Sequence, residues 1–460
     1  MKVPGTDLAV VILAAGEGTR MRSDLNKVLH EIGGRPMLGY PLAAAEALDP
    51  QHLVVVIGCD GEQVEEHFRG RADFVVQSER RGTGHAAQQA LPVLSGFSGE
   101  VLILYGDTPL LRAGTIERMR ALKAEKRADL VILTARLALP GRLVRDASGR
   151  VERIIEVTDA SPEELAIEEG NTGVYLLDAE LLARYLAQLD DCNEQGELYL
   201  TVIVSLAVDQ GMAVEALLLE DAEEALGVNT RAELAQAAAV VRRRTAERLM
   251  AEGVTLVDPD STYIDTDVEI GRDSRIDPGV VITGPSRLGE RVHVKPHCVI
   301  ESSQLDDDVQ LGPSAHLRPG CHLRSRVKIG NYVEVKNSDV GEGTKAAHLT
   351  YIGDADVGAG TTFGCGTITV NYDGERKWRT TVGERVFVGC NVNLIAPVTL
   401  CDDTYVAAGS TISKEVPSDA LAVARARQRN VEGWVSRRRK TGTAQQEPGS
   451  EGKSETREKE

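Results

Sequence analysis

Apolar residues follow two different patterns along this chain, and the pattern changes after residue 250. In the first half, short apolar runs alternate with stretches in which apolar residues recur at helical spacing. Such an alternation predicts a mainly parallel sheet in a doubly wound α/β domain. The predicted strands are 8–13, 53–57, 74–76, 101–105 and 130–134, and the helical patterns include 63–69 and 85–94.

From Ile264 onward, an aliphatic residue returns at every sixth position as far as Ile412, with a few shorter steps. A small or β-branched residue follows four positions later, as in Val268, Ser274 and Val280. A six-residue repeat of this kind predicts a β-helix of short stacked strands, with the aliphatic row inside. Three hexads per triangular coil give about eight coils, each in contact with its neighbours only. One insertion, 369–381, interrupts the repeat.

The two patterns divide the chain into a first domain 1–229, a helical linker 230–251, a β-helix domain 252–436 and a tail 437–460. The linker contains one helical stretch, 231–250, which is rich in Ala, Arg and Glu and predicts a rigid connector. The tail begins with Arg437-Arg-Arg-Lys440 and continues with polar residues to the end. Because such a composition cannot bury a core, we expect the tail to be disordered.

Composition narrows the classes of partner and compartment. The formal net charge of −18 disfavours nucleic acid as a partner, because a polyanion needs Lys and Arg to displace its counterions. The seven cysteines are scattered without a CxxC pair, which is typical of free thiols in a reducing compartment. The sequence also shows no signal-peptide pattern and no apolar stretch of membrane-spanning length. We therefore expect a cytoplasmic protein without stable membrane insertion.

A glycine-rich turn, 14–20, directly follows the first predicted strand. Its small residues let backbone N–H groups approach phosphates at the carboxyl end of the strand. Arg20 and Lys27 follow, and their charges would offset those of a triphosphate. Asp107 ends another predicted strand, where a carboxylate can hold Mg²⁺ on phosphate oxygens. Taken singly, each feature also fits an ordinary tight turn or a solvated surface charge.

The six-residue register places three chemically useful side chains on the outside of the β-helix. His348 lies two positions after the inward Ala346, so we expect it near a corner, where a histidine with a pKa near neutrality can act as a base. Arg318 and Lys336 face outward and could bind a phosphate. The insertion contains Asn371-Tyr372 and could wall a substrate groove. The alternatives are a solvent-facing histidine, solvated charges and a tolerated surface insertion.

Ordered blocks of sequence carry a specific resemblance. The blocks are Leu13-Ala-Ala-Gly-Glu-Gly-Thr-Arg-Met21, Lys27-Val-Leu-His30, Gln77 with Gly82-Thr-Gly-His85, Tyr105-Gly-Asp107, Glu156, Asn171-Thr-Gly173, Gly227-Val-Asn229, Val333-Glu-Val-Lys336, His348-Leu-Thr-Tyr-Ile-Gly-Asp354, Gly366-Thr-Ile-Thr-Val-Asn-Tyr-Asp-Gly374 and Ala407-Ala-Gly409. Together they resemble the bifunctional N-acetylglucosamine-1-phosphate uridyltransferase/glucosamine-1-phosphate acetyltransferase family over nearly the whole chain except the tail. The resemblance implies a Rossmann-like nucleotidyltransferase domain followed by a left-handed parallel β-helix of hexapeptide repeats.

For the first domain, the resemblance implies Mg²⁺-dependent transfer of uridylyl from UTP to N-acetylglucosamine 1-phosphate, with release of pyrophosphate. It implies that Asp107 and Asn229 ligate Mg²⁺, and that Lys27 contacts phosphate and acts in catalysis with Arg20. The residues implied to hold the nucleotide and the sugar are Leu13, Ala14, Ala15, Gly16, Lys27, Gln77, Gly82, Thr83, Tyr105, Gly106, Asp107, Gly141, Glu156, Asn171 and Asn229.

For the second domain, the resemblance implies acetyl transfer from acetyl-CoA to glucosamine 1-phosphate. His348 would take a proton from the 2-amino group, which then attacks the thioester. The residues implied to contact the amino sugar phosphate and acetyl-CoA are Arg318, Lys336, Tyr351, Thr362, Cys365, Asn371, Tyr372, Cys390, Ala408 and Arg425. The family also implies a homotrimer with the acetyl site between subunits, and a product that supplies peptidoglycan and lipopolysaccharide synthesis.

Two departures from the family pattern affect these assignments. Leu139-Pro140-Gly141-Arg142 stands where the family usually has Gly-Tyr-Gly-Arg. Thr362, Cys365 and Cys390 stand where some members have Asn, Ala and Ser. We interpret the cysteines as packing or contact residues and not as acyl carriers, because the sequence spacing offers no paired base.

Two other hypotheses compete with this one. The first is another sugar-phosphate nucleotidyltransferase, of the ADP-glucose or mannose-1-phosphate type, with a structural or regulatory β-helix; His348 and the Asn371-Tyr372 loop argue against it. The second is a noncatalytic scaffold, in which Lys27, Asp107, Asn229 and His348 would not be expected to persist together. Acetyl transfer from acetyl-CoA to glucosamine 1-phosphate tests the first alternative, and a sugar-nucleotide assay with the Lys27→Ala and His348→Ala variants tests the second.

Overall fold

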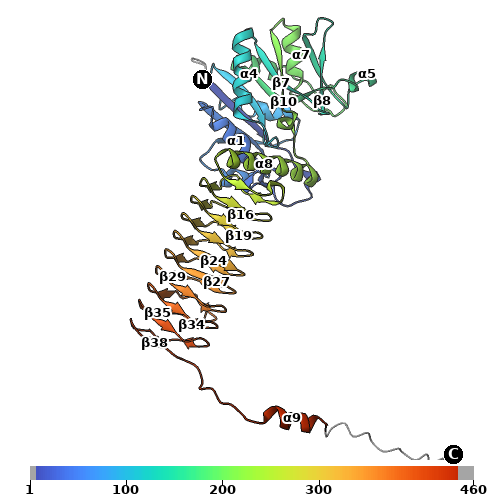
Figure 1. The fold of residues 1–460 in the computed structure, drawn as a ribbon. Helices are drawn as coiled ribbons and strands as arrows, with labels where there is room; N and C mark the ends of the chain where they lie inside the picture. Colours follow the sequence, from blue (N-terminus) through green and yellow to red (C-terminus); the bar gives the residue numbers. More distant parts are fainter. Residues whose placement is uncertain (1–6, 444–460) are drawn as a thin grey trace, which may run out of the picture.

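The computed structural model describes residues 7–443 and has two parts, shown in Figure 1. A domain built on one large sheet lies at one end, and a long column of short strands extends from it. Helix α8 lies where the two parts meet, and helix α9 lies beyond the last coil of the column (Figure 1). Within the described residues, no helix has both the length and the apolar character needed to cross a membrane.

The first domain is built on a nine-stranded mixed sheet with the path β11-β7-β10-β6-β1-β4-β5, from which β8 and β9 branch beside β10. All five predicted strands are confirmed. Along this path, β10 is the exception to the parallel arrangement, since it runs antiparallel to both β6 and β7, and the branch of β8 and β9 is also paired antiparallel. The strands are β1 (Leu8–Ala14), β4 (His52–Gly58), β5 (Asp73–Gln77), β6 (Glu100–Tyr105), β7 (Leu130–Arg136), β8 (Gly141–Arg145), β9 (Val151–Glu156), β10 (Glu169–Asp178) and β11 (Val214–Leu218), with a separate hairpin of β2 (Glu31–Ile32) and β3 (Arg35–Pro36).

Helices cover both faces of this sheet, as a doubly wound domain requires. Alternate residues of β1 enter different cores: Val11 packs with residues of α3, α6 and α7, and Val10 packs with residues of α1, α2 and α4. The helices are α1 (Gly39–Glu46), α2 (Glu62–His67), α3 (Thr83–Gln88), α4 (Ala113–Lys126), α5 (Pro162–Leu165), α6 (Ala179–Leu186) and α7 (Val202–Asp209), with 3-10 turns η1 (Thr19–Met21), η2 (Lys27–Leu29) and η3 (Ala222–Ala225). The predicted helix 85–94 is too long, because α3 ends at Gln88 and the chain continues in turns toward Pro92, which has no N–H to donate.

The second domain is a left-handed parallel β-helix with three faces. The first face contains β12 (Thr255–Leu256), β15 (Arg275–Ile276), β18 (His293–Val294), β21 (Gln310–Leu311), β24 (Lys328–Asn331), β27 (Lys345–His348), β30 (Thr362–Phe363), β33 (Phe387–Val388), β36 (Tyr405–Val406) and β38 (Leu421–Ala422). The second contains β13 (Tyr263–Ile264), β16 (Val281–Thr283), β19 (Val299–Glu301), β22 (His316–Leu317), β25 (Glu334–Lys336), β28 (Tyr351–Gly353), β31 (Ile368–Val370), β34 (Asn393–Ile395) and β37 (Thr411–Ile412). The third contains β14 (Glu269–Ile270), β17 (Arg287–Leu288), β20 (Gln304–Leu305), β23 (His322–Leu323), β26 (Asp339–Val340), β29 (Ala355–Val357), β32 (Thr380–Val382) and β35 (Val398–Leu400).

The six-residue repeat is confirmed as the inward row of the β-helix. The aliphatic residues from Ile264 to Ile412 are buried and belong to one continuous core. The three sheets have ten, nine and eight strands, in agreement with the predicted eight coils. The insertion is confirmed as a loop between β31 and β32, but the predicted bounds 369–381 are too wide, because residues 369–370 belong to β31 and residues 380–381 to β32.

Helix α8 (Arg231–Ala251) joins the two parts and packs on both. Thr230 and Glu233 form a capping box at its N-terminus. Its middle turns pack Val240 and Val241 against the first domain, whereas Leu249 in its last turn is fully buried in the core of the β-helix. The predicted connector is therefore docked along its length.

The end of the chain differs in part from the expectation. Helix α9 (Trp434–Thr443) extends into the segment from residue 437 that we expected to be disordered. Residues 444–460 of that predicted tail lie outside the described residues.

Candidate active sites

A cavity of about 310 Å³ opens at the carboxyl end of β1. Leu13 and Ala14 end this strand, and they line the cavity together with Ala15 and Gly16. Gly18, with φ of 68°, continues the turn, and a Cβ there would come within 2.6 Å of the Lys27 Cβ. The glycine-rich turn therefore lets the chain fold closely over Lys27 and leaves small residues at the strand end, where a phosphate-bearing ligand can approach.

The other wall of this cavity comes from the start of α3. Gln77 is buried and donates through Nε2 to the carbonyl oxygen of Gly82 at 3.0 Å. Gly82 has φ of 99°, and a Cβ there would lie 2.7 Å from the Leu198 carbonyl oxygen, so the turn requires glycine. Thr83 accepts from the backbone N–H of Leu200 at 3.1 Å. These contacts fix the residues that face the cavity.

A second cavity, of about 770 Å³, adjoins the first and shares Thr83, Tyr105 and Asp107 with it. Three predicted residues from separate blocks of sequence form one row across its floor. Gly141 on β8 lies opposite Glu156 on β9 and opposite Asn171 on β10. A Cβ at Gly141 would lie 3.0 Å from Ile154 and 3.3 Å from the Asn171 Cβ, so the row closes tightly only with glycine.

The polar side chains of this row are held in place by neighbours. Glu156 accepts from Thr201 Oγ1 at 3.1 Å, and burial raises the pKa of its carboxyl group. Asn171 donates to the hydroxyl of Tyr175 at 2.7 Å. Burial also raises the pKa of the Tyr105 hydroxyl, which remains a neutral hydrogen-bonding group near neutral pH. The row therefore presents neutral and acidic hydrogen-bonding groups, which suit a hydroxyl-rich ligand.

Lys27 lines the first cavity and connects the two predicted metal ligands, both of which line the second. Its Nζ lies 2.5 Å from Asp107 Oδ2 and 3.1 Å from Asn229 Oδ1. The Lys27 side chain is only 8% exposed. Three residues from distant parts of the sequence therefore meet at one buried positive charge. Arg20 is exposed and lines the second cavity.

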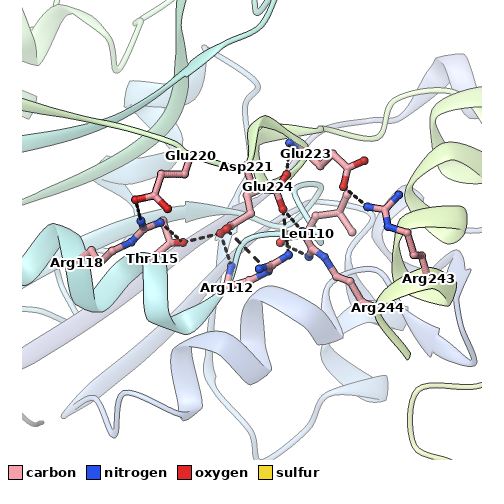
Figure 2. A network of polar contacts seen from close by, with 10 residues as sticks. All are labelled: Leu110, Arg112, Thr115, Arg118, Glu220, Asp221, Glu223, Glu224, Arg243 and Arg244. Atoms are coloured by element: carbon pink, nitrogen blue, oxygen red, sulfur yellow. Dashed lines mark hydrogen bonds and ion pairs between the residues drawn. The ribbon is translucent and has the colours of Figure 1, made fainter. Parts of the chain in front are cut away.

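A network of polar contacts, shown in Figure 2, holds the segment that leads to Asn229. The buried Glu224 in η3 accepts from the backbone N–H of Arg112 at 3.0 Å and from Thr115 Oγ1 at 2.7 Å. Asp221 pairs with Arg112 and also with Arg244 of α8. The Val228 N–H then donates to the Asp107 carbonyl oxygen at 2.9 Å. The two segments that carry Asp107 and Asn229 are therefore bonded to each other and to α8.

Two details in this domain refine the expectations. Gly106 is buried and donates to the Leu13 carbonyl oxygen at 2.9 Å, so it joins two strand ends and does not line either cavity. At the departure from the family pattern, Leu139 and Gly141 both line the second cavity. Arg142 does not line this cavity, and its guanidinium donates to the Leu139 carbonyl oxygen.

In the β-helix, four of the predicted acetyl-transfer residues form one column along a single corner: His348, Cys365, Cys390 and Ala408. Asn331 lies opposite His348 in the strand register. The registers on either side of the corner place His348 beside Cys365, Cys365 beside Cys390, and Cys390 beside Ala408. His348 is exposed, as predicted, and its Nδ1 lies 2.6 Å from Asn331 Oδ1. With this amide oxygen as acceptor, Nδ1 carries the proton and Nε2 is left to accept one.

The column corrects one premise of the sequence interpretation. Spacing along the sequence offered no base for the cysteines, yet one coil of the β-helix brings His348 next to Cys365. Their assignment as contact residues stays a prediction. Thr362 lies on β30 of the same coil as Cys365.

Positive charges gather on the adjoining second face. Arg318 and Lys336 occupy the same position of successive coils. The pKa of Lys336 is lowered, chiefly because the Lys377 amine of the insertion loop lies within hydrogen-bonding range, and secondly because of burial. Two amines that lie close together favour the binding of an anion, because the negative charge attracts both of them. Asp354 balances part of the charge, since its carboxylate lies 4.0 Å from Lys336.

The remaining predicted residues differ in how far they enter this site. Asn371 is buried and donates to Asp354 and to the Tyr351 hydroxyl, so the start of the insertion loop is fixed beside the charged face. Tyr372, Ala408 and Arg425 are exposed. Within the described single chain, this site is an open corner.

Comparisons with known proteins agree with the division of the chain into a sheet domain and a β-helix domain. Residues 10–198 match the family model of MobA-like NTP transferase domains, and residues 267–302 match that of bacterial transferase hexapeptide repeats. Proteins named bifunctional protein GlmU are similar over nearly the whole chain. That of Pelobacter propionicus is 48% identical and that of Trichlorobacter lovleyi 47% identical, each over 94% of this chain and 99% of the relative. That of Listeria welshimeri is 46% identical over 93% of this chain and 98% of the relative.

The chain belongs to the GlmU family. The resemblance to bifunctional uridyltransferase/acetyltransferase enzymes is thereby confirmed, and the chain is an enzyme of UDP-N-acetylglucosamine synthesis with nucleotidyltransferase and acyltransferase activities. The two competing hypotheses are not supported.

Sequence reasoning missed several residues that line the GlmU sites in this chain. Arg80 donates to the Ala15 carbonyl oxygen and lines the first cavity, and Glu197 lines both cavities. Lys377 faces Lys336, and Asn331 orients His348. Only Asn331 had a signal in the sequence, because it precedes His348 by one coil.

Proposed function

We propose that residues 1–229 carry the uridyltransferase and residues 252–436 the acetyltransferase, with 230–251 as a helical linker and 437–460 as a tail. The observation that carries the first assignment is the meeting of Lys27, Asp107 and Asn229 between two adjoining cavities. The observation that carries the second is the corner column, in which His348 leaves one ring nitrogen available.

In the first reaction, the smaller cavity would receive UTP and the larger one N-acetylglucosamine 1-phosphate. Backbone groups of the turn after β1 would approach the phosphates, and Gln77, Gly82 and Thr83 would contact the base. Lys27 lines the smaller cavity and contacts Asp107, which lines both, so its charge is available to the phosphorus that is attacked. Arg20 would add a second positive charge from the surface. Positioning and charge neutralisation supply most of the acceleration in such transfers, and no covalent intermediate is needed.

The donor set at Lys27 fits Mg²⁺. Asp107 and Asn229 present two oxygen atoms to one point, and Mg²⁺ binds oxygen ligands of this kind together with substrate phosphates. Residues 7–443 contain no cluster of three or more His, Cys, Asp or Glu side chains that could form a metal site by themselves, and phosphate oxygens and water would complete the coordination. Bound there, Mg²⁺ would neutralise phosphate charge. Lys27 would then exchange its two protein partners for phosphate oxygens.

In the second reaction, His348 Nε2 would take a proton from the 2-amino group of glucosamine 1-phosphate, which attacks the acetyl thioester. Arg318, Lys336 and Tyr351 would hold the sugar phosphate, and Thr362, Cys365, Cys390, Ala408 and Arg425 would contact acetyl-CoA. Asn371 and Tyr372 would wall the groove from the insertion loop. The order of the column supports this arrangement, because the base stands at one end and Ala408 at the other.

We also propose a homotrimer with the acetyl site between subunits. The exposed side chains of His348, Tyr372 and Arg425 support it, because a neighbouring β-helix would convert the open corner into a cleft. A cytoplasmic location is supported by the seven free cysteines, which persist in a reducing compartment. The partners are small-molecule substrates and not nucleic acid.

The test assays both half-reactions on the purified full-length protein, with and without a chelator. We expect acetyl transfer from acetyl-CoA to glucosamine 1-phosphate to persist in EDTA. Uridylyl transfer is expected to cease and to return when Mg²⁺ is added in excess. Uridylyl transfer that is unchanged in EDTA would contradict the metal assignment, and a protein without acetyl transfer would contradict the assignment of the corner column.

A further inference from the structure

Two cysteines occupy adjacent positions of the corner column. Phe363 lies opposite Val388 before the corner, and Ile368 lies opposite Asn393 after it, so Cys365 and Cys390 stand in register on neighbouring coils. The N–H of Asn391 donates to the Cys365 carbonyl oxygen at 2.8 Å, which shows that the two turns are stacked in contact. This chain therefore holds two thiols one coil apart.

The spacing of the coils suits a disulfide. In-register residues of neighbouring parallel strands lie about 4.8 Å apart at Cα. Disulfides join residues whose Cα atoms are about 4.4–6.8 Å apart. Both side chains leave the same position of the corner, so they project in the same direction. Cys390 is exposed and Cys365 is half-buried, so both can be reached by a small reagent.

The surroundings distinguish this pair from the other cysteines. Cys298 and Cys321 are buried in the core of the β-helix, and burial raises the pKa of both thiols. Cys365, in contrast, adjoins His348, which is the group with a nitrogen available to accept a proton. The thiolate is the form of cysteine that attacks disulfides, so the two thiols that a small reagent can reach are the candidates for exchange, and the two buried thiols are not.

We propose that Cys365 and Cys390 form a reversible disulfide that closes the acetyl-CoA side of the corner. This inference rests on the proposed function of the column. The oxidant is a low-molecular-weight disulfide. One cysteine thiolate attacks it and releases one small thiol, and the other thiolate then displaces the second small thiol from the mixed disulfide. Two electrons pass from the protein thiols to the oxidant, and the two thiol protons end on the two small thiols.

The experiment treats the full-length protein with oxidised glutathione, maps its peptides without reduction, and measures both transfer reactions. We expect a peptide pair linked through Cys365 and Cys390, lighter by two hydrogens and free of glutathione. Acetyl transfer is expected to be lost and then restored by dithiothreitol, while uridylyl transfer is retained. In Cys390→Ser, which lacks the second thiol, glutathione is expected to stay attached to Cys365.

Two controls make the result specific. The double variant Cys365→Ala/Cys390→Ser is compared with its own untreated rate and is expected to retain acetyl transfer in oxidised glutathione. Cys59→Ser, which removes an exposed thiol in the other domain, is expected to lose acetyl transfer as the unaltered protein does. Equal loss in the double variant would overturn the proposal, as would glutathione attached stably to both cysteines of the unaltered protein. A linked pair without loss of acetyl transfer would also overturn it. If the untreated protein transfers no acetyl group, the proposed function fails, while the peptide map still decides whether the thiols pair.

Discussion

In the sheet domain, Lys27 meets Asp107 and Asn229 although 80 and 202 positions separate them along the chain. In the β-helix, His348, Cys365 and Cys390 are neighbours because each occupies the same place in successive coils. The first site depends on how separate strands and loops are assembled. The second depends on the pitch of one repeated unit. A substitution in the first site should therefore affect contacts throughout its domain, whereas a substitution in the second should affect only the neighbouring coils.

The largest effect is expected for His348→Ala. Because a positioned base contributes about 10²–10⁴-fold, acetyl transfer should fall by that factor. Uridylyl transfer and the melting temperature should hardly change, since the side chain is exposed at a corner. His293→Ala, which removes another histidine of the same face three coils away, is the matched control and should leave both rates unchanged. A comparable loss in the control would contradict the assignment of the base.

A somewhat smaller effect is expected for Lys27→Ala. Loss of one preorganised charge at a reacting phosphate should reduce uridylyl transfer by about 10²–10³-fold while acetyl transfer continues. Lys126→Ala, at the surface end of α4, serves as the control for removal of a lysine. If Lys27→Ala slowed both reactions equally, the two sites would not be independent of each other.

Leu249→Ala tests whether the linker belongs to the second domain as well as to the first. Leu249 is fully buried in the core of the β-helix, so its truncation should cost about 2–5 kcal/mol of local stability. We expect differential scanning calorimetry to show a lower transition for the β-helix. Met250→Ala, one position along and exposed, should leave both transitions unchanged.

The smallest effect is a pH dependence at Glu156. Burial raises the pKa of this carboxyl group above its ordinary value of 4.5. Its contribution to stability is therefore fully present below pH 4.5 and is lost as the pH rises through the folded-state pKa. Glu156→Gln keeps an oxygen for Thr201 and cannot ionise, so the unaltered protein should lose melting temperature relative to the variant between pH 4 and pH 7. If the melting temperatures of the unaltered protein and of Glu156→Gln changed by the same amount over this pH range, the raised pKa would be contradicted.

The repeat made the β-helix predictable almost residue by residue. Six-residue arithmetic identified the buried row and placed His348 outside it, and the structure confirms both. The same arithmetic could have placed Cys365 beside His348, because 17 positions make one coil there. It could not place Lys377 against Lys336, because the insertion loop has no period.

The sheet domain was less predictable for a physical reason. Strand runs can be recognised from their own residues, but the antiparallel course of β10 depends on its neighbours β6 and β7. Likewise, Gly141, Glu156 and Asn171 form one row only after three strands have paired. Their grouping before the fold was known came from resemblance, and their roles remain predictions.

The double docking of α8 has a consequence for dividing the molecule. A chain cut before α8 would leave Ile32, Met37 and Val228 without the helix that covers them. A chain cut after α8 would remove Leu249 and Ala246 from the first coils of the β-helix. Helix α8 therefore completes the hydrophobic packing of both domains. If the two activities were separated into two proteins, each protein would need its own copy of this helix.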